Sequence, residues 1–224
     1  MAGGGLSETC AVVDCLVFSD IQYQRFGVRE VVLKQRSYVT VVSGVPRSGT
    51  SLMMRMLEAG GIVVLTDGLR KADEHNPRGY FEYEPVKKLA HDSSWMAEAR
   101  GKAVKIIHRL LMHLPDTFEY RVVFMDRALT EVFDSQREML AARGDAAARQ
   151  QEERIVRGLA EDVRRVKEWL AAQANTIVLS VPYAEVVQEP AKWSSEIARF
   201  LDGDLDERAM ASEVDAGLYR QRRE

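Results

Sequence analysis

A short glycine-rich loop between an apolar strand and an amphipathic helix constrains this chain more than any other feature. Residues 38–42 are β-branched and almost continuously apolar, which is typical of a strand buried on both faces of a parallel sheet. Residues 51–59 repeat apolar side chains at helical spacing, and a Gly-Gly pair follows them as a helix stop. Gly, Pro and Ser residues fill the loop over 43–50 that joins the two elements. The pattern therefore predicts a buried strand that turns sharply into a helix.

The same alternation of strand and helix continues to residue 201. Further strands are expected at 62–65, 103–107, 121–125 and 176–181, and further helices at 84–99, 129–142, 152–172 and 190–201. Strands that alternate with helices are typical of βαβ units, in which helices cover both faces of a parallel sheet. We therefore predict an α/β fold with three layers and a central parallel sheet of about five strands. Residues 1–37 carry no recognisable chemistry and are expected to be an extension ahead of the working domain, residues 38–224.

The composition excludes several classes of function. The net charge of −3, from 31 basic and 34 acidic residues, argues against a basic nucleic-acid binder. No apolar run approaches the ~20 residues that a membrane span needs, and the first residues lack the basic start of a signal peptide. The two cysteines, Cys10 and Cys15, have no nearby His and are too few for a disulfide scaffold. We therefore expect a cytoplasmic protein that neither spans a membrane nor binds nucleic acid.

The loop itself has the residue types of an anion site. Backbone N–H groups at the start of a helix bind phosphate, and Gly44 and Gly49 allow the tight backbone that such a loop requires. The nucleotide-kinase loop has the pattern G-x-x-x-x-G-K-[ST]. Here the two glycines and the final Ser51 match, but Thr50 occupies the Lys position and a cation occurs earlier, as Arg47.

This departure from the kinase pattern has a chemical meaning. In phosphoryl transfer the loop Lys and Mg²⁺ neutralise the crowded phosphates. A sulfuryl group carries less charge, so its transfer needs no metal, but a cation is still needed where negative charge develops on the leaving phosphate. Arg47 is suited to that place.

Residues 46–52, Pro-Arg-Ser-Gly-Thr-Ser-Leu, resemble the 5′-phosphosulfate loop of sulfotransferases that use 3′-phosphoadenosine 5′-phosphosulfate (PAPS). The resemblance is closest to the P-R-S-G-T form of the tyrosylprotein, glycan and bacterial branches, and it extends over roughly residues 38–201. It implies a fold of the P-loop type. It also implies that the backbone and hydroxyls of the loop hold the 5′-phosphate, through Arg47, Ser48, Gly49, Thr50 and Ser51.

A second motif supports the resemblance. The family binds the 3′-phosphate with an Arg at a strand end and a Ser eight positions later, and Arg127 and Ser135 have this spacing. An Arg can grip phosphate with two donors, and a Ser adds a hydroxyl. The family often has Asn-Pro or Asp-Pro after that Arg, whereas this chain has Ala128-Leu129.

A group that accepts the proton of the acceptor is less well defined by the sequence. Residues 105–108 resemble the K-T-H-L-P stretch of cytosolic sulfotransferases, with one residue more between Lys105 and His108. Asp67 lies twenty positions after Arg47, near where the tyrosylprotein branch has its Glu base, and Glu82 follows a predicted substrate loop. Asp67 and His108 are both retained as candidate bases. Lys105 is a candidate for stabilising the transferring sulfuryl group.

The resemblance implies transfer of a sulfuryl group from PAPS to a hydroxyl or amine of a small-molecule or glycan acceptor, without a metal. Two alternatives stay open. The first is an ATP-dependent P-loop kinase, in which Asp126 at the end of an apolar strand would hold Mg²⁺. The second is a nucleotide-binding module that keeps the anion loop and transfers nothing.

Overall fold

The computed structural model describes residues 36–70, 79–132 and 148–215, with side chains described from residue 157 onward in the last range. Five parallel strands form one sheet in the order β2-β3-β1-β4-β5. The strands are β1 (Val39–Gly44), β2 (Val64–Leu65), β3 (Ala103–Lys105), β4 (Tyr120–Asp126) and β5 (Thr176–Pro182). The predicted α/β fold with a parallel sheet of about five strands is therefore confirmed.

Strand β1 occupies the centre of the sheet and is buried along its whole length. Its side chains alternate between the two faces, as the two-residue period of a strand requires: Val39 and Val41 join one core cluster, and Val42 joins the other. A strand covered on both faces needs apolar side chains at nearly every position. This requirement explains the continuous apolar run that marked β1 in the sequence.

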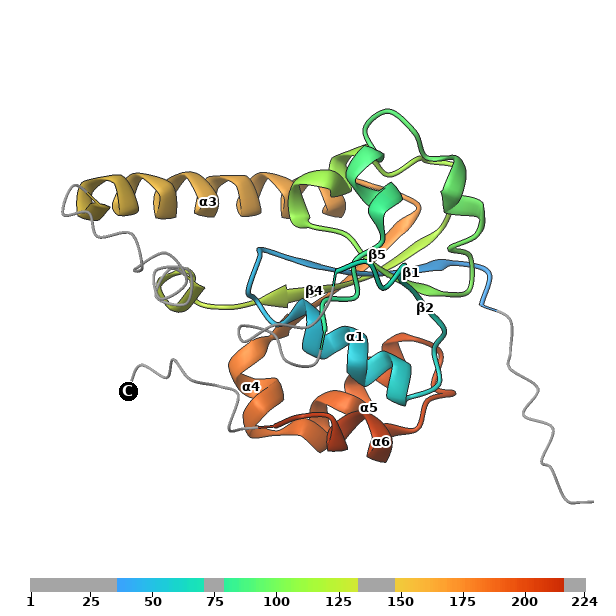
Figure 1. Ribbon diagram of the computed structural model, residues 1–224. Coiled ribbons are helices and arrows are strands. Elements are labelled where there is room, and N and C mark those ends of the chain that lie inside the picture. The colour runs from blue at the N-terminus through green and yellow to red at the C-terminus, as the bar shows by residue number, and fades with distance from the viewer. Residues whose placement is uncertain (1–35, 71–78, 133–147, 216–224) are drawn as a thin grey trace, which may run out of the picture. The chain divides into compact units, whose positions relative to one another are not determined.

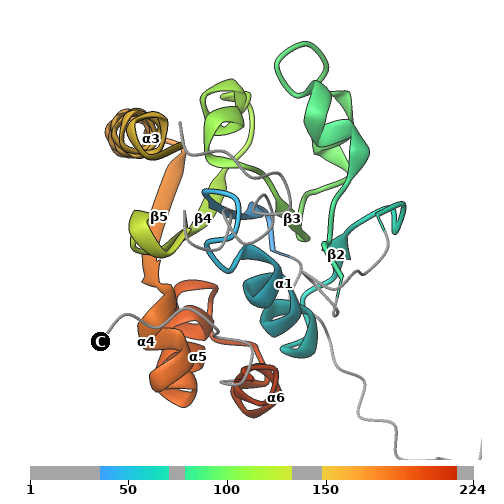
Figure 2. The same ribbon diagram turned by 60° about the vertical axis from the view of Figure 1, so that its left-hand side comes forward.

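Helices cover both faces of the sheet (Figures 1 and 2). One face carries α1 (Thr50–Ala59), α4 (Tyr183–Gln188), α5 (Pro190–Phe200) and α6 (Glu207–Ser212). The other carries α3 (Ala148–Ala171) and three short 3₁₀ helices, η1 (Glu84–Lys88), η2 (Ser94–Ala97) and η3 (His108–His113). Each face has its own apolar core, so the predicted three-layer arrangement is confirmed.

The helix predicted over residues 84–99 is replaced by η1 and η2. The carboxylate of Asp92 accepts a hydrogen bond from the backbone N–H of Ser94 at 2.9 Å, and such local side-chain bonds compete with helical ones. The rings of Tyr83 and Trp95 then pack edge to face, with their centroids 5.5 Å apart. The two short turns thus bring apolar side chains onto the sheet where one continuous helix was expected.

Beyond residue 201, where the sequence analysis predicts no further element, the chain forms the helix α6. The side chain of Asp206 caps α6 by accepting a hydrogen bond from Ala209 N–H at 2.9 Å. Met210 is buried against the end of α1, where a Cβ on Gly60 would lie 2.8 Å from its Cγ. Gly60 therefore lets the end of α1 pack closely against α6.

Some predictions concern residues outside the described ranges. Residues 1–35 of the predicted extension lie outside them, so its boundary at residue 37 stays a prediction. The helix predicted over 129–142 begins at residue 129 and is described only as far as 132. Within the described ranges, no helix has the length and apolar character needed to cross a membrane.

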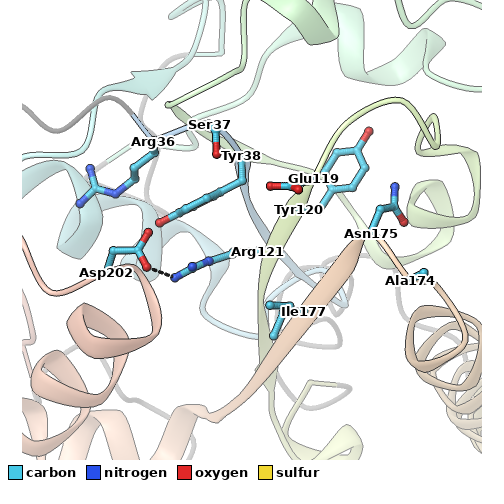
Figure 3. Close-up of a pocket in the computed structure, with 10 residues that line it drawn as sticks. All are labelled: Arg36, Ser37, Tyr38, Glu119, Tyr120, Arg121, Ala174, Asn175, Ile177 and Asp202. Carbon is cyan, nitrogen blue, oxygen red and sulfur yellow. Dashed lines mark ion pairs between the residues drawn. The ribbon is translucent and has the colours of Figure 1, made fainter.

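Arg121, near the start of β4, lines a cavity of about 340 Å³ at the edge of the sheet formed by the amino ends of the strands (Figure 3). Arg121 pairs with Asp202 at 2.7 Å, donates to the carbonyl of Phe200 and lies 4.3 Å from the centroid of the Tyr38 ring. Phe200 ends α5, so the guanidinium meets the negative end of that helix dipole. This contact anchors α5 to the sheet.

Replacing Leu57 by Ala should lower the free energy of unfolding by about 2–5 kcal/mol, because Leu57 is fully buried on α1 and its removal leaves a cavity. Glu58, the next residue, is exposed, and Glu58→Ala should change stability by no more than about 0.5 kcal/mol. Urea denaturation followed by circular dichroism measures both. Equal effects of the two variants would contradict the packing of α1 described above.

Candidate functional site

The carboxyl ends of all five strands meet at one edge of the sheet, because every pair is parallel. The chain passes from β1 outward to β2, returns through β3 and then crosses to β4, so the strand order reverses at β1. Open α/β sheets bind ligands at such a reversal, outside the carboxyl ends of the strands. The structure thus brings Arg47, Asp67, Lys105, His108 and Arg127 to this one edge.

The loop between β1 and α1 follows a tight path. Ser48 N–H donates to the carbonyl of Val45 at 3.1 Å, and Arg47 has a φ of 70°, a left-handed conformation that costs a non-glycine residue roughly 1–3 kcal/mol. The N-cap of α1 is Gly49, and within the described part of the chain no side chain caps this helix end. Uncapped N–H groups at a helix start are the donors that bind anions.

The two glycines of the loop are required by close packing. At Gly44 a Cβ would lie 2.4 Å from Ser48 Oγ and 2.8 Å from the carbonyl oxygen of Met125. At Gly49, which has a φ of 99°, a Cβ would lie 2.3 Å from the ring of Tyr183. Ser48 is fully buried, and its Oγ has no hydrogen-bond partner among the described residues. An unsatisfied buried hydroxyl in an anion loop is a donor available to a ligand.

Arg127 contacts the loop directly. Its Nη1 donates to the backbone carbonyl of Arg47 at 3.0 Å, and its Nε pairs with Glu131 Oε2 at 3.1 Å. The side chain is only 9% exposed, so both contacts lie in a sheltered place where charge interactions are strong. Arg127 therefore lies against the backbone of Arg47. Ser135, the other predicted ligand of the 3′-phosphate, lies outside the described residues.

Tyr183 is part of the site, although the sequence analysis above did not identify it. Its ring packs against Gly49, and the Arg127 guanidinium lies 4.6 Å from the ring centroid. Burial raises the pKa of the Tyr183 hydroxyl, while Arg127 opposes that shift. Its position directly after β5, at the same edge as the loop, is the signal that could have identified it.

Lys105, at the carboxyl end of β3, is the most perturbed cation of the edge. It lies beside Val42 of β1, and its Nζ donates to the backbone carbonyl of Tyr80. Burial lowers its pKa to about 8; the charge of Glu82 opposes this, and that of Arg70 adds to it. Lys105 is therefore an ammonium that loses its proton within the range in which enzymes work.

Two chain segments, 66–70 and 79–84, pair beside Lys105. Thr66 Oγ1 donates to the carbonyl of Glu82 at 3.0 Å, and Arg70 pairs with the carboxylate of Glu82 at 2.6 Å. The Arg70 guanidinium also lies 3.5 Å from the centroid of the Tyr80 ring. Ser51 Oγ donates to the carbonyl of Tyr80 at 3.4 Å, so this carbonyl joins the segment to the start of α1 as well as to Lys105.

Asp67 lies at the same edge, but its carboxylate is occupied. Its Oδ1 accepts a hydrogen bond from Leu69 N–H at 3.0 Å, and its Oδ2 accepts one from Glu84 N–H at 2.5 Å. These backbone donors lower the pKa of Asp67. The geometry is that of a residue that organises the turn and the start of η1, and it weakens the expectation that Asp67 accepts a proton.

His108 begins η3 and is only 2% exposed. Burial, aided by Arg109, lowers the pKa of its ring; the nearby backbone of Gly44 and the charge of Asp162 oppose that shift. Neither ring nitrogen makes a hydrogen bond of normal geometry with the described residues. The lowered pKa favours the neutral ring that a base requires, but the ring is buried beside the backbone of Gly44.

Asp126, the candidate Mg²⁺ ligand of the kinase alternative, is held by a lysine. Both of its carboxylate oxygens lie 2.7 Å from Lys167 Nζ of α3. Across the described residues, no group of three or more His, Cys, Asp and Glu side chains is arranged to hold a metal ion. Lys167 therefore already occupies both carboxylate oxygens with which Asp126 would bind Mg²⁺.

No protein-family model and no curated protein matches the chain. Among solved structures, the chain is similar to the sulfotransferase domain of the olefin synthase from Synechococcus PCC 7002, with a TM-score of 0.50 and 15% sequence identity. The match covers 84% of this chain and 80% of that domain. At this identity the likeness concerns the fold, which is a sulfotransferase-like α/β fold.

Replacing Gly49 by Ala should destabilise the protein and abolish anion binding by the loop, because the new Cβ would overlap the Tyr183 ring at a strained φ. A glycine in a different environment provides the control. A Cβ at Gly158 of α3 meets nothing, so Gly158→Ala should stabilise the protein by up to about 1 kcal/mol. Urea denaturation measures stability, and calorimetric titration with pyrophosphate measures anion binding. A Gly49→Ala variant as stable as Gly158→Ala would contradict the packing at Gly49.

Proposed function

We propose that this protein is a sulfotransferase that moves the sulfuryl group of PAPS to a hydroxyl or amine acceptor. The observation that carries the proposal is the contact between Arg127 and the backbone carbonyl of Arg47, which sets two arginines beside one uncapped helix start. The loop has arginine where kinases use a later lysine. The sulfotransferase-like fold of the whole domain supports the same reading.

In this proposal the donor is held at two adjacent places. The backbone N–H groups from Ser48 to Ser51, with their hydroxyls, bind the 5′-phosphate at the positive end of the α1 dipole. Arg127, with Ser135, binds the 3′-phosphate. Both phosphates are attached to one ribose, so their sites must be neighbours, and the short contact from Arg127 to the loop meets this condition.

The transfer breaks one bond and forms one bond. The acceptor oxygen or nitrogen attacks the sulfur, and the bond from sulfur to the bridging oxygen of the 5′-phosphate breaks. That oxygen keeps the electron pair and leaves as part of 3′,5′-bisphosphoadenosine (PAP), while the acceptor gives its proton to a base. Arg47 stabilises the charge that develops on the leaving oxygen, and Lys105 stabilises the oxygens of the sulfuryl group in flight. No metal ion takes part.

The base is assigned to a group whose lone pair is available at pH 7. The carboxylate of Asp67 is occupied by two backbone donors and that of Glu82 pairs with Arg70 at 2.6 Å, which leaves His108 as the better supported acceptor of the proton. The ring of His108 is neutral, and its use requires η3 to move enough to uncover it. Glu82 lies at the segment beside Lys105, but its carboxylate is paired with Arg70.

The kinase alternative is less well supported by the geometry. Its Mg²⁺ ligand would be Asp126, whose carboxylate is neutralised by Lys167. Its loop would also lack the lysine that approaches the terminal phosphates.

The donor is tested by ligand-induced stabilisation of the full chain. PAP should raise the melting temperature in the absence of Mg²⁺, because a ligand that binds only the folded state stabilises it. Adenosine 5′-monophosphate, which lacks the 3′-phosphate, should stabilise the protein much less. Stabilisation by Mg-ATP with none by PAP would refute the sulfotransferase and favour the kinase. PAP binding without transfer of label from ³⁵S-PAPS to any of a broad panel of acceptors would favour the non-catalytic module.

The two arginines should differ in what their removal costs. Arg47→Ala should lower kcat by about 10²–10³ with little change in PAP affinity, because its cation acts on charge that develops only during transfer. Arg127→Ala should weaken PAP binding by at least about tenfold and affect kcat less. Steady-state kinetics and calorimetric titration with PAP separate the two effects. Equal changes in both constants for each variant would contradict these roles.

Lys105 should give the enzyme an alkaline limit. Its ammonium is present below its pKa of about 8 and is lost above it, so kcat/KM should fall as the pH rises through about 8. Lys105→Arg keeps the charge at every working pH and should remove this fall in kcat/KM, while Lys105→Ala should have a low kcat/KM at every pH. A wild-type profile that stays flat to pH 9.5 would exclude Lys105 from the transfer step.

A further inference from the structure

A second cavity, of about 400 Å³, opens directly beside the anion loop. Its walls come from three places: the first residue after β1, the carboxyl end of β4 with the residues that follow it, and the half of α3 nearest to the sheet. The side chains that define it are Val45, Phe124, Leu129, Ala160, Val163 and Lys167. Cavities of this size, next to reactive groups, are the usual places for small ligands in proteins.

The cavity has an apolar floor and a charged rim, where Lys167 pairs with Asp126 and Arg164 pairs with Glu168. Val45 and Phe124 are 3% and 1% exposed, so they form a rigid floor. Lys167 presents its hydrocarbon stem, while its ammonium pairs with Asp126 and lies 5.0 Å from the centroid of the Phe124 ring. A ligand in the cavity therefore contacts apolar surface, and the charges of Lys167 and Asp126 neutralise each other. A sugar would have to give up hydration without gaining hydrogen bonds from the floor.

The cavity also lies where an acceptor would have to approach. Val45 precedes Arg47 by two residues, and Arg127 lies at the cavity rim while donating to the carbonyl of Arg47. On the other side of the loop, the Tyr183 ring fills the space below Gly49 and faces the Arg127 guanidinium. Tyr183 is only 8% exposed, so this side of the loop is packed closed. The apolar cavity on the α3 side is then left for the second substrate.

We propose that this cavity binds the body of the acceptor, and that the acceptor is a compact apolar alcohol, phenol or amine. This inference rests on the proposed sulfotransferase function and narrows its acceptor from small molecules and glycans to apolar small molecules. The nucleophilic oxygen or nitrogen sits at the rim beside Arg47, and the hydrocarbon body lies over Val45 and Phe124.

A cavity-filling variant tests the proposal, with a matched control on the same helix. Ala160 lines the cavity and is exposed at its mouth, so Ala160→Trp fills the space with little effect on folding. Gly158 is exposed on the same helix and does not line the cavity, and a Cβ there meets nothing, so Gly158→Trp adds the same side chain elsewhere. The probes are PAP, then 2-naphthol or methyl β-glucoside added to the PAP-saturated full chain, each followed by calorimetric titration.

In the PAP-bound wild type, 2-naphthol should bind and methyl β-glucoside should not. Ala160→Trp should weaken 2-naphthol binding at least tenfold and leave the dissociation constant of PAP within twofold, while Gly158→Trp should change neither. A tenfold loss of PAP affinity in Ala160→Trp alone would assign the cavity to the nucleoside and overturn the proposal. Failure of 2-naphthol to bind, or equal binding of the glucoside, would overturn it as well.

Failure of the underlying function would look different. If the wild type did not bind PAP at all, the sulfotransferase proposal would fall, and with it the role of the cavity as an acceptor site. Titration of 2-naphthol into the nucleotide-free chain and into Ala160→Trp would then decide whether the cavity takes an apolar ligand.

Discussion

The hydrogen bond from Arg127 to the carbonyl of Arg47 is the contact on which the candidate site depends. It follows from the register of the sheet: β1 and β4 pair in parallel, with Gly44 opposite Met125, so the residues that leave the two strands emerge side by side. Arg47, which accepts this bond, has a left-handed φ of 70°. A loop fixed in this way presents its donors without needing to rearrange when an anion arrives.

The same loop is tied to the core below it. The Tyr183 ring packs under Gly49, and Tyr183 belongs to the apolar cluster that also contains the buried side chains of α1. The loop therefore rests on a packed layer, in which small shifts are resisted because interiors are dense. On the opposite side, α3 contributes a cavity wall and the lysine that neutralises Asp126. Rigid support thus lies on one side of the loop and open space on the other.

Much of this arrangement could be predicted from the sequence, and the rest could not, for identifiable reasons. The strand β1, the loop and α1 were predictable because a doubly buried strand and a helix have different apolar periods. The replacement of a long helix by η1 and η2 was not, since local contacts such as the hydrogen bond that Asp92 accepts from Ser94 N–H compete with helical ones. The occupation of the Asp67 carboxylate by Glu84 N–H joins residues seventeen positions apart. Such contacts exist only once the segments have folded together. The spacing of Asp67 from Arg47 suggested a base because it carries no information about these contacts.

The low proton affinity of Lys105 has a consequence for any anion that settles beside it. Near pH 8 only part of the population carries the ammonium. A negative group at that place favours the charged form, so its arrival draws protons from the surrounding solution and its departure returns them. Association is then coupled to hydrogen-ion uptake, and the occupancy of the site falls as the medium becomes more alkaline, even where the chemistry that follows is unaffected.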